Sequence, residues 1–214
     1  MSAHPLAALL ADAARGVFPP FDGLVQVTPS PGPPCDVLIA FTGHYVLAAD
    51  VSASEIAARW PAGELSLPFA PASLVWLAER IGRDPFTHDV LLVAIGDGSG
   101  APSWLQRDDD LSHPRVDAAS EFRTIESIWT TDDRSAFVMI GRGICGRWEV
   151  GYEVDPDRRG SGLGRRIVAA ALGLVPPDEA LWAQVAAPNA ASLRSTLAAG
   201  FAPVGAEVLF GPHK

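Results

Sequence analysis

The stretch from Trp148 to Gly164 constrains the fold more than any other part of the chain. Its opening residues, WEVGYEV, are rich in β-branched and aromatic side chains and predict a strand that ends at Asp155-Pro156. A glycine-rich turn follows, and apolar residues then recur at spacings of three and four, which predicts a helix with one face on a core. The glycines therefore lie where the amides of a helix N-terminus point outward. The apolar positions of the helix are Leu163, Ile167, Ala170, Ala171 and Leu174.

Arginine side chains surround this predicted helix start. The helix dipole favours acidic groups in the first turn and disfavours cations there. Cations gathered at such an end are explained when an anion lies between them. A diphosphate fits, because backbone N–H groups bind its oxygens while guanidinium groups neutralise its charge. Glycine suits the turn because a Cβ atom would hold the backbone away from the ligand. The arginines are Arg158, Arg159, Arg165 and Arg166.

Two common phosphate-binding motifs match this turn poorly. A P-loop requires Gly-Lys-Ser/Thr at its end, and the only lysine of the chain is Lys214. A dinucleotide fingerprint requires G-x-G-x-x-G early in a βαβ unit. Here the last position is Arg165, and the stretch lies late in the chain. A nucleotide-binding site and a purely structural glycine turn remain as alternatives.

A different pattern fits the residues better. Val154-Asp155-Pro156 followed by RGSGLG at 159–164 resembles the acetyl-CoA motif of the GNAT acyltransferases. The downstream chain continues as in that family, with a buried strand over 180–186, an asparagine that opens a helix, a small residue three positions on and a closing Gly-Phe pair. The resemblance covers residues 121–210 well and the first hundred residues poorly. The matching residues of the second helix are Asn189, Ser192, Gly200 and Phe201.

The resemblance implies an α/β (α+β) fold with a mixed, mostly antiparallel sheet flanked by helices. The residues agree, because from Glu121 onward they predict an antiparallel meander that leads into a βαβαβ arrangement. We expect residues 115–214 to form the acyl-CoA-binding half. Residues 1–114 are expected to form a divergent half that contributes opening strands and helices, either on the acceptor side or as an accessory region, within one compact domain.

The first half shows ordinary signals for short helices and strands. Ser52 with Glu55 three residues later predicts a capped helix, and Thr42-Gly43 predicts the turn of a hairpin. The acidic run in 101–118 is interpreted as a solvated loop. The predicted elements are a helix over 5–15, a strand over 24–28, a hairpin over 36–49, helices over 52–60 and 71–81, and a strand over 89–95.

The resemblance also implies the chemistry, which is direct transfer of an acetyl group from acetyl-CoA to an amine. The backbone from Tyr152 to Val154 would pair with the pantetheine arm and polarise the thioester carbonyl. Arg165 or Arg166 would reach the second phosphate. Asn189 and Ser192 would contact the arm or cap the second helix. The residues expected to hold the pyrophosphate are Arg159, Gly160, Ser161, Gly162, Leu163 and Gly164.

Two catalytic positions of the family are not filled by the usual residues. The tyrosine of the second helix is Thr196 here, and a glutamate found in some members is Gln184. We therefore predict Glu149, on the strand before the glycine turn, as a general base that acts through water. The alternative role for Glu149 is a salt bridge with Arg147. If no base is present, positioning alone supplies the rate, or the chain is a non-catalytic acyl-CoA-binding or sensing module.

Charge and composition indicate which classes of molecule the protein can bind. The net charge of −9 argues against general nucleic-acid binding, which requires a basic surface. The resemblance implies an amine of a small molecule or peptide as the acceptor, and an acidic surface is compatible with an amine. No apolar run reaches membrane length, and no metal site is predicted. The cysteines, Cys35 and Cys145, form no disulfide framework, which predicts a reduced, cytoplasmic protein. A homodimer is expected because GNAT domains often form dimers.

Overall fold

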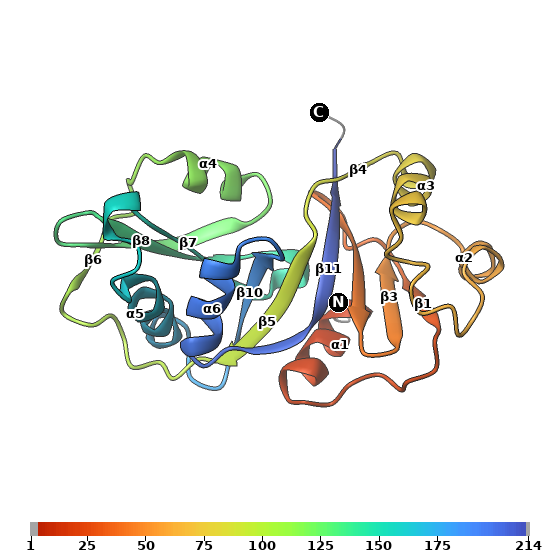
Figure 1. Cartoon of the computed structure of the whole chain (residues 1–214), viewed down its shortest axis with the longest axis horizontal. Helices are drawn as coiled ribbons and strands as arrows, with labels where there is room; N and C mark the ends of the chain where they lie inside the picture. Colours follow the sequence, from red (N-terminus) through yellow and green to blue (C-terminus); the bar gives the residue numbers. More distant parts are fainter. Residues whose placement is uncertain (1–3, 213–214) are drawn as a thin grey trace. The chain divides into compact units, whose positions relative to one another are not determined.

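The computed structural model describes residues 4–212, so Lys214 lies outside the described residues. The chain forms two compact units (Figure 1). One contains the residues up to Val90 and those from Val204 onward, and the other is Leu91–Pro203. This division differs from the expected boundary at residue 114. The final strand pairs with the N-terminal hairpin, and such long-range pairing leaves no local signal in the sequence.

The N-terminal unit is a small mixed sheet with three helices. Its strand order is β1-β3-β2-β11, with β4 beside β11. β1 and β3 run parallel, and the other pairs are antiparallel. Its core includes Leu38, Trp60, Leu77 and Phe210. The elements are α1 (Pro5–Ala14), β1 (Val25–Thr28), β2 (Asp36–Phe41), β3 (His44–Ala48), α2 (Ala53–Arg59), α3 (Pro71–Ile81), β4 (Asp84–Pro85) and β11 (Ala202–Gly211).

Several local predictions for this unit are confirmed. The Ser52 hydroxyl accepts a hydrogen bond from the Glu55 amide at 3.2 Å and caps α2. The hairpin turn falls between Phe41 and His44, which pair across it. Gly82 ends α3 in the left-handed conformation, at φ +66°. These features are set by residues close together in sequence, which is why the sequence predicts them.

The second unit is built on a sheet with strand order β5-β10-β9-β8-β7-β6. Antiparallel pairing joins β6 to β7, β7 to β8 and β8 to β9, whereas β9 and β10 run parallel. This is the mixed, mostly antiparallel sheet that was predicted. The elements are β5 (Asp89–Ile95), β6 (Leu105–Arg107), α4 (Pro114–Ser120), β7 (Thr124–Thr131), β8 (Ala136–Arg142), β9 (Trp148–Val154), α5 (Leu163–Ala170), β10 (Ala180–Ala186) and α6 (Ala190–Ala198).

The segment 101–118 was predicted to be a loop, and this is wrong in part. It contains β6 and the first five of the seven residues of α4. The helix begins where the His113 ring accepts a hydrogen bond from the Arg115 amide at 3.1 Å, with Pro114 in the first turn. Proline is compatible with that position because the first amides of a helix have no partner within the helix. The start of α4 was not predicted from the sequence, because the acidic run just before it is typical of a solvated loop.

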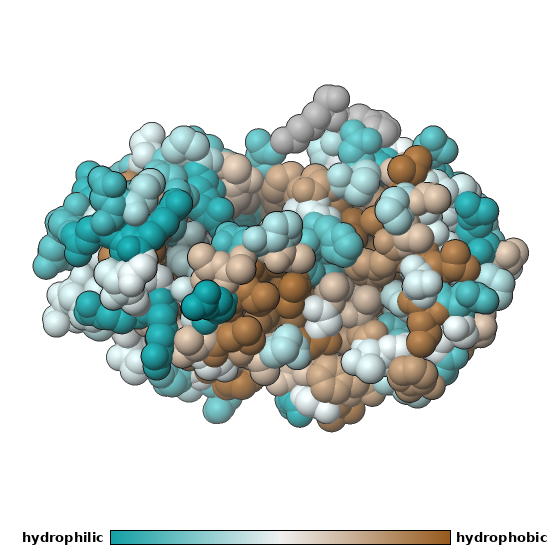
Figure 2. Space-filling model, in the orientation of Figure 1, coloured by the Kyte–Doolittle hydropathy of each residue, from teal (hydrophilic) through white to brown (hydrophobic). Residues whose placement is uncertain are grey.

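The helices of this unit cover both faces of its sheet. α4 packs through Val116 against Ile128, Phe137 and Met139 on one face. α5 buries Leu163, Ile167 and Val168 and contacts β8, β9 and α6. Figure 1 shows α4 and α5 on opposite sides of β7 and β8. The surface around α4 and the β7–β8 hairpin is largely hydrophilic (Figure 2), because these apolar residues face inward.

Candidate active site

The two parallel strands at the centre of this unit separate along their length. β9 and β10 pair at two positions, Trp148 with Leu181 and Glu149 with Trp182. On its other edge, β9 pairs with β8 from Trp148 to Val154. The edge of β9 from Val150 to Val154 is therefore without a strand partner in the described register. Backbone N–H and C=O groups along such an edge are available to an extended ligand.

A cavity of about 680 Å³ adjoins this open edge. Its walls come from the end of β9, the glycine turn, α6 and Arg115 at the start of α4. Both α4, through Arg115, and α6 contribute residues to its lining. The predicted residues that line it are Tyr152, Val154, Arg159, Gly160, Gly162, Gly164, Arg165, Asn189 and Ser192.

Two of the residues that were predicted to hold the pyrophosphate have side chains outside the cavity. The Ser161 hydroxyl donates a hydrogen bond to the Arg158 carbonyl at 2.7 Å, within the turn. Leu163 is buried in the core beneath α5. Neither side chain lines the cavity. Ser161 therefore shapes the turn and Leu163 anchors the helix, and any contact with a ligand would come from their backbone.

The glycines of the turn serve two different purposes. Gly160 and Gly162 adopt φ values of +75° and +82°, a conformation that L side chains rarely take. A Cβ atom on either would meet no neighbour within 4 Å, so the space above the turn is open. At Gly164, by contrast, a Cβ atom would lie 3.3 Å from the Ser195 hydroxyl. Gly164 therefore permits the close approach of α5 and α6.

The first turn of α5 has amides without side-chain partners. Gly162 is its N-cap residue, and no side chain of the described residues caps the helix. The start of α6 is different, because the Asn189 side-chain oxygen accepts a hydrogen bond from the Ser192 amide at 3.1 Å. The predicted capping role of Asn189 is thereby confirmed. The free amides of α5 face the cavity wall, which is the arrangement that binds an anion.

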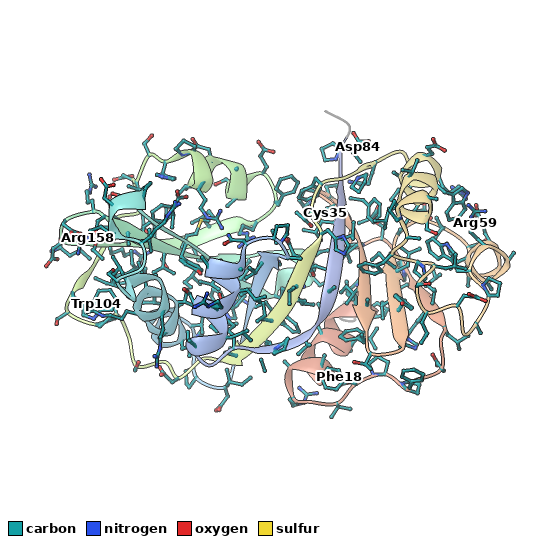
Figure 3. All side chains as sticks on the ribbon, in the orientation of Figure 1. Phe18, Cys35, Arg59, Asp84, Trp104 and Arg158 are labelled. Atoms are coloured by element: carbon teal, nitrogen blue, oxygen red, sulfur yellow. The ribbon has the colours of Figure 1, made fainter. Side chains whose placement is uncertain are left out.

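The structure separates the four arginines that the sequence placed together. Arg159 and Arg165 line the cavity, and the Arg159 Nε atom donates to the Val154 carbonyl at 3.0 Å. Arg158 forms an ion pair with Asp133 of the β7–β8 turn. The Arg166 guanidinium lies 4.7 Å from the centre of the Trp104 ring. Figure 3 labels Trp104 beside α5 and Arg158 at the outer end of this unit.

Two further arginines line the cavity and were missed in the sequence. Arg194 lies on α6 and Arg115 at the start of α4. The signal for Arg194 was its place in a predicted helix, whereas Arg115 lay in a segment interpreted as a loop. With Arg159 and Arg165 they give the cavity four cations against one acid, Glu153. The cavity is thus positive in a chain whose net charge is −9, which favours an anionic ligand.

Glu149 lies in a structural ion-pair cluster and not in the cavity. Its side chain is 4% exposed, its Oε1 atom is 2.7 Å from Arg147 Nε, and its Oε2 atom is 3.2 Å from Arg123 Nη2. Burial acts to raise the pKa of this carboxyl, but the charges of Arg147 and Arg123 outweigh it and hold the pKa below its usual value. A carboxylate fixed in this way is a poor base. The salt bridge with Arg147, weighed as the alternative, is present.

The two positions that depart from the family pattern also lie away from the cavity. Thr196 is fully buried, and its hydroxyl has no hydrogen-bond partner among the described residues. The Gln184 amide lies beside Glu149 and helps to lower the pKa of that carboxyl, although no hydrogen bond of normal length joins it to any described residue. Neither side chain lines the cavity.

Comparison with known proteins identifies the class of this unit. Residues 103–201 match the model of the acetyltransferase (GNAT) family. These residues form a GNAT acetyltransferase domain, which confirms the resemblance seen in the C-terminal half of the sequence. The match of this segment to the family model supports acyl transfer in general. The matched segment includes α4 and extends through α6, so it contains every residue that lines the cavity.

Solved structures give more distant likenesses, and no curated protein matches the chain. A GNAT-family protein from Novosphingobium aromaticivorans is 22% identical over 62% of this chain and 69% of its own, with a TM-score of 0.39. A GCN5-related N-acetyltransferase from Kribbella flavida is 16% identical over 69% and 66%, also with a TM-score of 0.39. A counterpart from Sphaerobacter thermophilus is 12% identical over 65% and 55%, with a TM-score of 0.39. The family assignment rests on the family model.

Residues 4–212 contain neither a candidate metal site nor a candidate membrane-spanning helix. No group of three or more His, Cys, Asp or Glu side chains in this part of the chain is arranged to hold a metal ion. No helix there combines the length and the apolar character needed to cross a membrane.

Proposed function

We propose that this chain transfers an acetyl group from acetyl-CoA directly to the amine nitrogen of a small-molecule or peptide acceptor. The proposal rests on one observation, which is that three features border the same cavity. These are the open edge of β9, the uncapped N-terminus of α5 and the surrounding arginines. Each feature suits one part of acetyl-CoA, namely the amide-bearing arm, the diphosphate and the remaining phosphate charge.

The open edge has the length and polarity that an extended arm requires. From Val150 to Val154 it spans roughly 13 Å, at about 3.3 Å per residue. Its backbone groups can pair with the amides of the arm as a neighbouring strand would. The glycine turn follows directly, so a diphosphate bound there would bring the arm beside the backbone at the end of β9. In this arrangement the thioester carbonyl lies against the backbone between Tyr152 and Val154.

The chemistry follows from that placement. A backbone N–H of this segment stabilises the negative charge that develops on the thioester oxygen. The cavity reaches the face covered by α4, which gives an amine a route to the carbonyl carbon. Fixing both reactants in one cavity supplies much of the rate by itself. The homodimer and the cytoplasmic location stay as predictions from the sequence.

Thermal-shift titration of the purified protein tests the donor. Acetyl-CoA at 100 times its dissociation constant adds about 2.7 kcal/mol to the free energy of unfolding. For a chain of this length, this raises the melting temperature by roughly 5–10 °C. ATP and NAD, tested at the same concentrations, are expected to give no comparable shift. Equal shifts with all three would favour a general nucleotide site, and no shift with acetyl-CoA would contradict the proposal.

Arg165 and Arg166 offer a matched pair for locating the phosphates. Arg165→Gln removes a cation from the cavity, and the loss of one charge-assisted hydrogen bond, worth about 1.5–3 kcal/mol, weakens acetyl-CoA binding roughly 10- to 100-fold. Arg166→Gln removes the neighbouring cation, which stacks on Trp104, and is expected to leave the dissociation constant nearly unchanged. Isothermal titration measures both. Equal effects in the two variants would place the phosphates elsewhere.

A non-catalytic acyl-CoA-binding module is the second candidate. It is favoured by the engagement of Glu149 with two arginines and by the burial of Thr196. Acyl transfer to a panel of amines, followed through release of free CoA thiol, separates the two functions. Binding of acetyl-CoA without amine-dependent thiol release would support the module.

A further inference from the structure

Tyr152 presents a phenol to the cavity from the middle of β9. Its hydroxyl oxygen lies 2.7 Å from the Ser192 hydroxyl and 3.3 Å from the Ser192 carbonyl on α6. A Cβ atom placed on Gly164 would lie 3.8 Å from the Tyr152 ring. The ring therefore extends from β9 toward the gap between the start of α5 and α6, beside the backbone that the proposed function assigns to the thioester.

The cavity offers few groups that can give up a proton. Its guanidinium groups stay charged at any accessible pH, and an ionised carboxylate only accepts hydrogen bonds. Serine hydroxyls and the asparagine amide are too weakly acidic. Tyr152 is left as the proton donor among the cavity-lining side chains of the described residues. Thr196, which stands at the position of the family's tyrosine, is buried away from the cavity.

We propose that Tyr152 is the general acid that protonates the departing sulfur, an inference that rests on the proposed function. The amine nitrogen uses its lone pair to form the new N–C bond at the thioester carbonyl carbon. The C–S bond breaks, and its electron pair goes to sulfur. The phenolic proton of Tyr152 moves to that sulfur, which leaves as a free thiol. The nitrogen releases one proton to water, and the phenolate takes one proton from water.

The surroundings of Tyr152 suit both of its charge states. When the Ser192 hydroxyl donates its hydrogen bond to the phenolic oxygen, the phenolic O–H donates to the Ser192 carbonyl at 3.3 Å, and its proton leaves this long hydrogen bond when it moves to the sulfur. The hydrogen bond from the Ser192 hydroxyl stabilises the phenolate after transfer, because charge-assisted hydrogen bonds are the stronger ones. The cavity arginines add to this effect. Ser192 thus acts as a positioning residue for Tyr152.

Tyr152→Phe tests this role with little change in shape. General acid catalysis contributes about 10²–10⁴-fold, so we expect kcat to fall at least roughly 100-fold while the dissociation constant for acetyl-CoA changes less than about threefold. The matched control is Tyr45→Phe, since Tyr45 is the other tyrosine of the chain and donates its hydroxyl to the Leu65 carbonyl in the N-terminal unit. This control is expected to keep the wild-type kcat.

A pH profile distinguishes proton transfer from a structural role. A general acid must carry its proton, so the kcat of the wild-type protein decreases toward the alkaline range where phenols ionise. Tyr152→Phe is expected to lack this decrease. A variant that keeps the wild-type kcat, or keeps the alkaline decrease, overturns the role of Tyr152. If the wild-type protein neither binds acetyl-CoA nor transfers its acetyl group, the proposed function fails, whatever the variant does.

Discussion

Replacing Glu149 by glutamine is expected to destabilise the protein by about 3–5 kcal/mol, because removing one partner of a buried ion pair leaves the other charge uncompensated. Arg147 is 4% exposed and Arg123 16% exposed, and both contact the Glu149 carboxylate. For a chain of this length, the loss lowers the melting temperature by roughly 6–20 °C. Differential scanning calorimetry measures it.

The control for this substitution is Glu126→Gln. Glu126 is an exposed residue of β7, and surface substitutions of this kind change stability by about 0.5 kcal/mol or less. If Glu149→Gln melted like the wild-type protein but lost its activity, the ion-pair interpretation would fail. Glu149 would then return as the candidate base.

The same cluster makes the stability depend on pH in a defined direction. Because the folded-state pKa of Glu149 lies below the usual value of 4.5, this carboxylate contributes stability above the unfolded-state pKa. That contribution is lost as the pH falls through the lower folded-state pKa. We expect the gap in melting temperature between the wild-type protein and Glu149→Gln to be constant near neutral pH and to narrow below about pH 4.5. A gap that widens in acid would contradict the assignment.

Gly162→Glu is expected to weaken acetyl-CoA binding by more than about 100-fold, since unfavourable juxtaposition of like charges costs several kcal/mol. The new carboxylate would occupy the open space above the turn, where the diphosphate is proposed to lie. It would also take the place of a residue whose φ of +82° favours glycine. Titration calorimetry with acetyl-CoA gives the ratio directly.

Gly146→Glu provides the control for charge and backbone strain. Gly146 has a φ of +74°, and a Cβ atom there would meet no neighbour within 4 Å. It lies in the turn before β9 and does not line the cavity. The control therefore carries the same added charge and a similar backbone cost, and we expect it to bind acetyl-CoA normally. Equal loss of binding in both variants would attribute the effect to strain.

The sequence predicts the local parts of this unit well. β9 and β10 fall on the predicted bounds, and Asn189 begins α6 as expected. These features depend on alternating side chains, proline and capping residues within a few positions of one another. The glycine turn was predicted for the same reason, because the glycines that it requires lie within a few consecutive residues.

The remaining features depend on distant contacts. Nothing near Glu149 indicates that Arg123, which precedes β7, will reach its carboxylate. β9 and β10 pair at only two positions before they separate. This separation depends on how the two strands pack together, so the sequence of either strand does not indicate it. Arg115 was missed because its short helix follows an acidic run. The sequence also places four arginines around the start of α5, and only the fold distributes them among the cavity, Asp133 and Trp104.

The open edge of β9 also bears on solubility. An unpaired strand edge is a template for strands of other molecules, and proteins limit that hazard by keeping such edges short and surrounding them with charge. Here the edge is confined to the residues from Val150 to Val154 and adjoins a cavity bordered by Arg115, Arg159, Arg165 and Arg194. A strand from a second copy would have to bring its own chain past these like charges. The arrangement that leaves the backbone open to a small anionic molecule thus also discourages aggregation.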